Sequence, residues 1–540
     1  MWEILNELPR ESKIELNKYW VSISLEFLWW VWDFEKWVSL TWSATKLTIN
    51  FPDGRKSVWL IDFWMFQWCE NELKYNEILP FDLKEIDFVL LTHTHVDHLW
   101  KMLHFSKQDF DWVIWTTKVN KEVLTTMLSD VIKLQPKNDL TQVEKIEEKI
   151  KNYLSLINEM KWFWADALDQ INWVIEDLEN EKKELLKEVD IKKNEKEFFE
   201  KQDLMNLLTK INSVWYNEKV EVKNDIEISF ISAGHLPWSA QIILKIKAAN
   251  NKYVKIWFSW DLWKVKNPAV WWAPIVSKTK LDLYMIESTY AGRSHPNFLE
   301  EEKKLIKSLN ETLKRWWKVL FPIFMQWRAQ ELWIYLNYLI WTWKIPDVPL
   351  FYHSNNIEKI TEIYARNFPE LFWKLIKWWN FNKAVTWKWK KRQEHFNNYK
   401  WPAIILASWW MMDWWAIQNY LDLLENPNNL FVSAWYQWEN TLGHKVFTEQ
   451  VDQIELPKIW KININSRLHN LRWFSGHADE EDLLYLLSQM SFSKDAKIVI
   501  NHWEKWVSQT LFWLAIKWVV GRTREILFAD FNENNYIEKS

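Results

Sequence analysis

One short stretch combines imidazole and carboxylate groups at metal-ligand spacing. His93, His95, Asp97 and His98 lie within six positions, directly after the apolar run 88–91. That run predicts a buried strand; if it extends to about His95, alternation places His93 and His95 on the same side. Neutral imidazoles with a carboxylate suit zinc or a similar divalent ion. A lone histidine is commonly a core or surface residue, but four such groups together favour a metal site.

Further metal-capable side chains stand just past predicted strands or turns elsewhere in the chain. They are His235, Asp261, Glu287, His477 and His502. Any one of them alone is weak support for a site, whereas the repetition indicates strand ends that converge. Asp62 also ends an apolar run, where it could accept a hydrogen bond from a ligating histidine. A turn-capping role for Asp62 is the alternative, and spacing alone does not decide between the two.

The elements that must position these groups change in character along the chain. Residues 1–130 alternate short apolar runs with turn signals, which predicts a β-rich layer. Residues 292 to about 455 alternate helix and strand, which predicts a second, parallel α/β domain. Between 141 and 199, Lys/Glu-rich sequence with apolar residues at steps of three and four predicts amphipathic helices. We interpret these as an inserted helical hairpin, which could serve as a dimerisation arm or an RNA-positioning arm.

Length and composition restrict the class of protein. A chain of 540 residues should divide into two or three units, and its net charge of −4 means that a nucleic-acid ligand needs a local cleft. Cys69 is the only cysteine, which excludes disulfides within the chain and favours a reducing, cytoplasmic compartment. The N-terminus has no apolar signal segment, and no run of about 18 apolar residues predicts a membrane span.

The balance of tryptophan and glycine is abnormal. The chain has 47 Trp and 6 Gly, although ordinary usage would give roughly 38 glycines in this length. Many of the tryptophans, such as Trp64, Trp100 and Trp260, stand at turns where glycine is the usual residue. We therefore hypothesise that the gene reads UGA as glycine and was translated with UGA as tryptophan. The alternative is a truly Trp-rich protein with aromatic binding platforms.

Together these residues resemble the metallo-β-lactamase superfamily and, within it, the β-CASP nucleases, which include RNase J and the cleavage-and-polyadenylation endonucleases. His93 to His98 match the His-x-His-x-Asp-His signature. The family expects glycine at Trp100, Trp260 and Trp503. The resemblance implies an α/β fold, a metallo-β-lactamase αββα sandwich with an inserted β-CASP α/β domain and a helical-hairpin insertion at about 135–205. It further implies a first domain part at 1–290, a β-CASP cap at 291–455 and a C-terminal domain part at 456–540.

The resemblance also implies the ligands of two zinc ions. His93, His95 and His235 would hold one ion, Asp97, His98 and His502 the other, and Asp261 would bridge the two. Phosphodiester hydrolysis needs a nucleophile at neutral pH and stabilisation of charge on the attacked phosphate, and paired zinc ions supply both.

Other positions take roles in the reaction. Asp97 is the candidate to orient or deprotonate the attacking water. His477, in motif B, is the candidate proton donor to the leaving 3′-oxygen, and Glu287, in motif A, would orient it. The alternative for Glu287 and His477 is a structural polar pair. Arg328, at a predicted helix start, and Ser475 are candidate substrate contacts; a surface ion pair is the alternative for Arg328.

The expected function is a zinc-dependent ribonuclease of RNA processing or decay, acting on RNA as an endonuclease and, as an open second mode, a 5′-to-3′ exonuclease. A homodimer is left open. Two alternatives remain, a DNA-processing nuclease of the same superfamily and a catalytically inactive RNA-binding scaffold. A thioesterase or lactamase is disfavoured because such enzymes lack the cap and the motifs around Glu287, His477 and His502.

Overall fold

The computed structural model describes residues 10–11, 13–27, 31–33, 38–40, 44–63, 81–99, 102–106, 110, 112–134, 179, 183, 201–265, 274–276, 278–324, 326–353, 356–369, 401–408, 411–412, 415–435, 437, 441–456, 459–471, 476–501, 506–521 and 525–529. The chain divides into two compact units. The first contains residues 1–101, 110–126 and 210–540, and the second contains residues 102–109 and 127–209.

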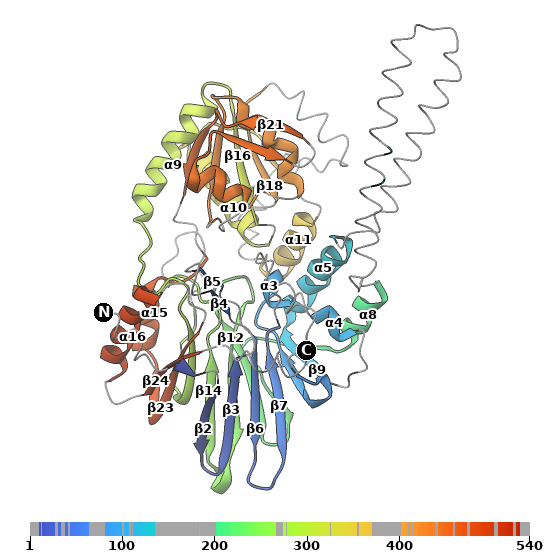
Figure 1. The fold of residues 1–540 in the computed structure, drawn as a ribbon, viewed down its shortest axis with the longest axis vertical. Coiled ribbons are helices and arrows are strands. Elements are labelled where there is room, and N and C mark those ends of the chain that lie inside the picture. Colours follow the sequence, from blue (N-terminus) through green and yellow to red (C-terminus); the bar gives the residue numbers. More distant parts are fainter. Residues whose placement is uncertain are drawn as a thin grey trace, which may run out of the picture. The chain divides into compact units, whose positions relative to one another are not determined.

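Two large β-sheets form the body of the first unit (Figure 1). The eight-stranded sheet has the order β1 (Arg10–Glu11), β24 (Glu525–Ala529), β23 (Ser491–Asn501), β15 (Lys280–Glu287), β14 (Tyr253–Phe258), β13 (Ala240–Lys247), β12 (Ile226–Ser232), β11 (Lys219–Lys223). The seven-stranded sheet has the order β10 (Ile211–Val214), β9 (Val113–Thr117), β8 (Phe88–Leu90), β7 (Lys56–Ile61), β6 (Thr45–Asn50), β3 (Val21–Phe27), β2 (Lys13–Lys18).

The main hydrophobic core lies between the two sheets. In β2, buried Ile14 and Leu16 alternate with exposed polar residues, as expected for a strand with one buried face. Their cluster continues into the facing sheet through Ile228, Ile242 and Ile256, all fully buried. The two sheets are therefore held face to face by apolar packing.

Within the first unit, helices accompany both sheets. On the eight-stranded sheet, α15 (Glu480–Ser488) and α16 (Trp506–Val520) share a second core with β15 and β23. Next to the seven-stranded sheet, α3 (Val96–Leu99) and α5 (Lys118–Leu134) follow β8 and β9. The second unit contains α4 (Met102–Ser106) and α8 (Lys201–Thr209). This arrangement confirms the predicted αββα layers.

A separate five-stranded sheet confirms the predicted parallel α/β domain. Its order is β17 (Leu350–His353), β18 (Ala403–Ser408), β16 (Lys318–Ile323), β19 (Leu430–Ser433), β22 (Arg467–Asn470), and all of its pairings are parallel. Cores on both faces include side chains of α9 (Phe298–Leu313), α10 (Arg328–Trp341), α11 (Ile357–Asn367) and η5 (Trp415–Glu425). The sheet includes β22, although the predicted division placed residues from 456 onward in the third segment. That division stays a prediction.

Smaller elements complete the described residues. Two hairpins pair β4 (Val31–Asp33) with β5 (Val38–Leu40) and β20 (Gln453–Leu456) with β21 (Ile459–Asn463). Short helices are η2 (Leu83–Glu85), η3 (Ala249–Asn251), α14 (Leu442–His444) and η6 (Lys445–Glu449). The predicted hairpin at 135–205 lies outside the described residues, except for 179, 183 and the start of α8. Among the helices described, none is long and apolar enough to span a membrane.

Several tryptophans occupy left-handed backbone positions. Positive φ angles of 46° to 71° occur at Trp20, Trp238, Trp260, Trp316, Trp327 and Trp343. A Cβ atom disfavours this region, and glycine is the residue that enters it without strain. These angles support the hypothesis that tryptophan replaces glycine, which stays a prediction. Trp64, Trp100 and Trp503 lie outside the described residues.

Candidate metal centre

The loop after β8 carries the first two histidines. The prediction of a strand that reaches His95 was wrong, because β8 ends at Leu90 and α3 begins at Val96. The Thr92 amide N–H donates to Asp62 Oδ1 at 2.8 Å, and the Thr92 carbonyl accepts from the Ala240 amide at 2.9 Å. A side chain and the first residue of β13 thus satisfy the Thr92 backbone, although Thr92 belongs to no strand. The loop nevertheless brings His93 Nε2 within 3.1 Å of His95 Nδ1.

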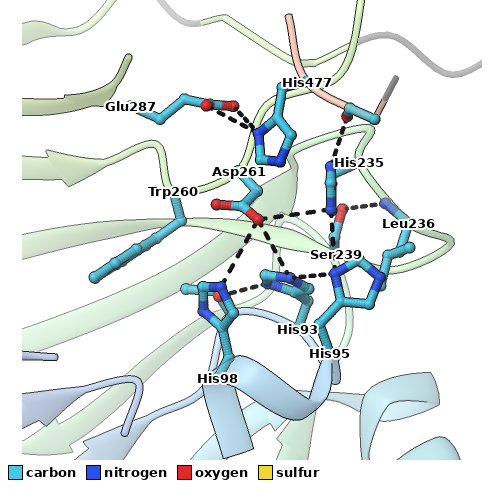
Figure 2. A network of polar contacts seen from close by, with 12 residues as sticks. His93, His95, His98, His235, Leu236, Ser239, Trp260, Asp261, Glu287 and His477 are labelled. Carbon is cyan, nitrogen blue, oxygen red and sulfur yellow. Dashed lines mark hydrogen bonds and ion pairs between the residues drawn. The ribbon is translucent and has the colours of Figure 1, made fainter. Parts of the chain in front are cut away.

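Two further strand ends complete a cluster of four ligand atoms. His235 follows β12, and Asp261 follows β14. Asp261 Oδ2 lies 3.6 Å from both His93 Nε2 and His235 Nε2, and His235 Nε2 lies 3.3 Å from His95 Nδ1. Figure 2 shows these side chains converging on Asp261. Four ligands about 2.1 Å from a tetrahedral zinc would lie about 3.4 Å apart, so the spacing fits such an ion.

Hydrogen bonds determine which ring nitrogens can act as ligands. His235 Nδ1 donates to the Gly476 carbonyl at 2.7 Å, which leaves a lone pair on Nε2. His93 Nδ1 lies 3.0 Å from Thr92 Oγ1, whose hydroxyl donates to Asp62, so this histidine also presents a lone pair on Nε2. His95 Nδ1 faces both of these nitrogens, and one proton could not satisfy both contacts. A cation among the three nitrogens would satisfy them all.

Burial keeps these imidazoles neutral. It lowers the pKa of His93, His95 and His235 well below the ordinary histidine value, although the charge of Asp261 opposes this shift. Neutral imidazole is the form that binds metal. These three histidines and Asp261 therefore form a group that could hold a metal ion.

The same oxygen of Asp261 also faces a fourth histidine. His98 Nε2 lies 3.7 Å from Asp261 Oδ2 (Figure 2). His98 Nδ1 bonds to Asp62 Oδ2 at 2.7 Å, so of the two roles that the sequence left open for Asp62, the structure shows the contact with a histidine. Burial raises the pKa of Asp62, while His98 and Thr92 oppose this rise. The buried acid thus orients His98 toward Asp261.

The remaining predicted ligands lie outside the described residues. They are His502 and the side chain of Asp97, although the backbone of Asp97 belongs to α3. Ser475, a predicted substrate contact, also lies outside them. Of the second ligand set, the structure therefore describes only His98 and the bridging candidate Asp261.

Glu287 and His477 form a pair beside the cluster. Glu287, the last residue of β15, lies 3.0 Å through Oε2 from His477 Nδ1. Its Oε1 accepts from the Leu262 amide at 2.5 Å, one residue after Asp261. Burial by itself lowers the pKa of His477, but the charges of Glu287 and Asp261 outweigh it and raise the pKa to about 9. The pair therefore presents a protonated imidazole next to the metal site.

Arg328 begins α10 and lies close to the same cluster. Its Nη1 is 3.0 Å from Glu331 Oε2, and both side chains are buried, so the pair is not the surface ion pair considered above. Its guanidinium lies over the Trp263 ring, 4.0 Å from the ring centroid. A side chain at Gly476 would collide with that guanidinium. The lack of a side chain at Gly476 therefore leaves room for the cation.

Sequence reasoning missed two residues near the site. Gln326 Nε2 donates to Thr94 Oγ1 at 2.6 Å, between the two loop histidines. His295 Nε2 contacts the His477 carbonyl at 2.8 Å. Neither residue belongs to a ligand-like spacing. The one signal for His295 was a histidine placed eight residues after Glu287.

Comparisons with known proteins agree with this architecture. Residues 329–446 match the Beta-Casp domain, and residues 461–511 match the Zn-dependent metallo-hydrolase RNA specificity domain. The chain is 27% identical to an RNase J-like protein of Methanocaldococcus jannaschii, over 57% of this chain and 71% of that protein. It is 23% identical to a ribonuclease of Thermus thermophilus, over 88% of this chain and 93% of that enzyme.

A third relative is the transcription termination factor FttA of Thermococcus kodakarensis, 26% identical over 78% of this chain and 57% of the factor. The two matched domains cover most of the parallel sheet and the segment that carries His477. Because two of these relatives align over 78% and 88% of this chain, its similarity to β-CASP proteins of the metallo-β-lactamase fold extends beyond the two matched domains.

Proposed function

We propose that this protein is a zinc-dependent ribonuclease that hydrolyses RNA phosphodiester bonds in RNA processing or decay. The observation that carries the proposal is the placement of the Glu287–His477 pair beside the cluster of His93, His95, His235 and Asp261. The RNA specificity domain and the ribonucleases among the relatives favour RNA as substrate. Endonucleolytic cleavage is the main mode, and 5′-to-3′ exonucleolytic cleavage is a second.

We assign two zinc ions to the site. His93, His95 and His235 would hold the first, and Asp97, His98 and His502 the second, with Asp261 between them. When bound, zinc supplies a nucleophilic water at neutral pH and neutralises charge on the phosphate. The hydrogen bonds to Thr92, Gly476 and Asp62 fix the histidine rings in the required orientation.

The protein groups then act on protons and charge. Asp97 orients or deprotonates the attacking water, whose oxygen forms a bond to phosphorus as the bond from phosphorus to the 3′-oxygen breaks. His477 gives its proton to that leaving oxygen, while Glu287 holds the imidazole and favours its protonated form. Arg328 and Ser475 contact substrate phosphate, which the buried guanidinium beside His235 supports for Arg328. A cytoplasmic location and a homodimer stay predictions.

A cleavage assay with matched substrates tests this function. The protein is incubated with RNA carrying a 5′-monophosphate or a 5′-triphosphate and with DNA of the same sequence, with and without a chelator. We expect internal cleavage of both RNAs that stops on chelation and returns with zinc. Preferential cleavage of DNA would support the DNA-processing alternative. RNA binding without cleavage, at less than one zinc per chain, would support the inactive scaffold.

A further inference from the structure

Two consecutive carbonyls of the loop that carries His477 each accept a hydrogen bond from an imidazole. The Gly476 carbonyl accepts from His235 Nδ1 at 2.7 Å, and the His477 carbonyl accepts from His295 Nε2 at 2.8 Å. The first bond belongs to the metal site. The second comes from a residue to which neither the metal site nor the proposed chemistry assigns a role.

His295 is part of a larger contact between its own loop and the His477 loop. Its backbone N–H donates to Asp479 Oδ2 at 2.9 Å, and Tyr290 pairs with Asp479 as an isolated β-bridge. The Tyr290 ring lies 4.8 Å from the His295 ring and nearly parallel to the His477 ring, at 6.4 Å. The segment after Glu287 therefore contacts the segment around His477 at several points.

The protonation state of His295 allows its Nε2 to donate the hydrogen bond to the His477 carbonyl. Burial, helped by the charge of Lys264, lowers its pKa to about 4, so the ring is neutral at pH 7. A neutral imidazole carries one N–H. Because a carbonyl can only accept, that hydrogen lies on Nε2 and is directed at the His477 backbone.

The position of the His477 ring depends both on its contact with Glu287 and on the backbone of His477. Glu287 orients the ring through Nδ1, but the position of the ring also depends on the backbone to which it is attached. A misplacement of about 1 Å at a reacting group can lower a rate about 100-fold. A hydrogen bond to the carbonyl of the same residue limits such a displacement.

We propose that His295 is a positioning residue for the proton donor, because its Nε2–H bond to the His477 carbonyl holds the imidazole where the leaving oxygen will be. This inference rests on the proposed ribonuclease function. His295 itself contacts no substrate atom in this scheme, so its removal should act only through His477.

Leaving-group chemistry separates this role from a merely structural one. The nitrophenolate ion of bis(p-nitrophenyl) phosphate leaves without protonation, whereas the 3′-oxygen of RNA requires a proton. We expect His295→Leu to lower kcat for RNA about 10- to 100-fold with little change in KM, and to lower kcat for the nitrophenyl ester much less. His295→Gln keeps an N–H donor and should recover most of the rate with RNA. Zinc content, measured by atomic emission, should be unchanged.

A second background and a matched control complete the test. In a His477→Ala protein, His295→Leu should cause no further loss with RNA, since the two residues act as one unit. His469→Leu removes another half-buried histidine, which is bonded to Ser308 in the parallel domain. This control variant should leave the ratio of kcat for RNA to kcat for the nitrophenyl ester unaltered. The role of His295 would be overturned if His295→Leu lowered kcat equally for RNA and for the nitrophenyl ester. It would also be overturned if the variant lowered kcat for RNA by the same factor with and without His477. Failure of the unmodified protein to cleave RNA would refute the ribonuclease function and, with it, this inference.

Discussion

The turn between β2 and β3 gives the sharpest test of the tryptophan hypothesis. Lys18 pairs with Val21, so Tyr19 and Trp20 form a two-residue loop, with φ angles of 51° and 71°. Positive φ at both positions is the geometry in which Asn-Gly is preferred. Trp20 is 81% exposed and buries little apolar surface. Its replacement by glycine should therefore remove strain at almost no cost in packing.

The expected gain follows from two opposing terms. A side chain in the left-handed region costs roughly 1–2 kcal/mol, and the extra freedom of glycine in the unfolded chain costs roughly 0.5–1 kcal/mol. Trp20→Gly should therefore raise the free energy of unfolding by about 0.5–1 kcal/mol. Trp316→Gly and Trp343→Gly should do the same, because these residues have φ of 71° and 59° and are 59% and 87% exposed.

Trp518→Gly is the matched control. Trp518 is 82% exposed but lies inside helix α16, where glycine should destabilise the fold by about 0.5 kcal/mol. Urea unfolding followed by circular dichroism gives the free energies without depending on tryptophan fluorescence. Destabilisation by all three turn variants to the extent seen for Trp518→Gly would refute the reasoning. UGG codons at Trp64, Trp100 and Trp260 would also contradict the hypothesis at the level of the gene.

Three further predictions concern the site and its surroundings. Asp62→Asn should weaken zinc binding about 10- to 100-fold, measured by competition with a chelator, because the amide cannot accept all the bonds from Thr92 and His98. His477→Ala should lower kcat about 100- to 10,000-fold without loss of zinc; lost zinc would instead make His477 a ligand. Burial and the Asp479 charge raise the pKa of Asp482 to about 6, so the folded state holds its proton more tightly than the unfolded state. Stability should therefore decline as pH rises from about 4 to 6, and Asp482→Asn should flatten that decline in urea unfolding curves.

Apolar runs followed by metal-capable side chains made much of the fold and of the ligand cluster predictable from the sequence. His235 and Asp261 follow apolar runs that do form β12 and β14, and strand ends of one sheet layer meet at a common edge. The strand before His93 was predicted too long, because apolar periodicity carries no information about the side chains that satisfy a loop backbone. Here Asp62 and Asn120, the latter through its bond to the Thr92 carbonyl, supply those contacts.

Contacts made by ordinary polar residues across long separations could not be predicted. His295 meets His477 across 182 positions, and Gln326 meets Thr94 across 232. Neither His295 nor Gln326 has a spacing or residue type that would distinguish it in the sequence from an ordinary surface residue. Only the packing of the parallel domain and of the loop after β15 brings these donors to their acceptors.

The buried carboxylate of Asp62 links the two sides of the metal centre. One of its oxygens accepts from the Thr92 amide, and the other accepts from the Thr92 hydroxyl and from His98 Nδ1. The same hydroxyl contacts His93 Nδ1. A single acid thus fixes the loop backbone and the orientation of two histidines, His93 and His98, that both face Asp261. Because the ligand geometry and the loop fold depend on the same hydrogen bonds, metal affinity and loop stability should change together when any one of these bonds is removed.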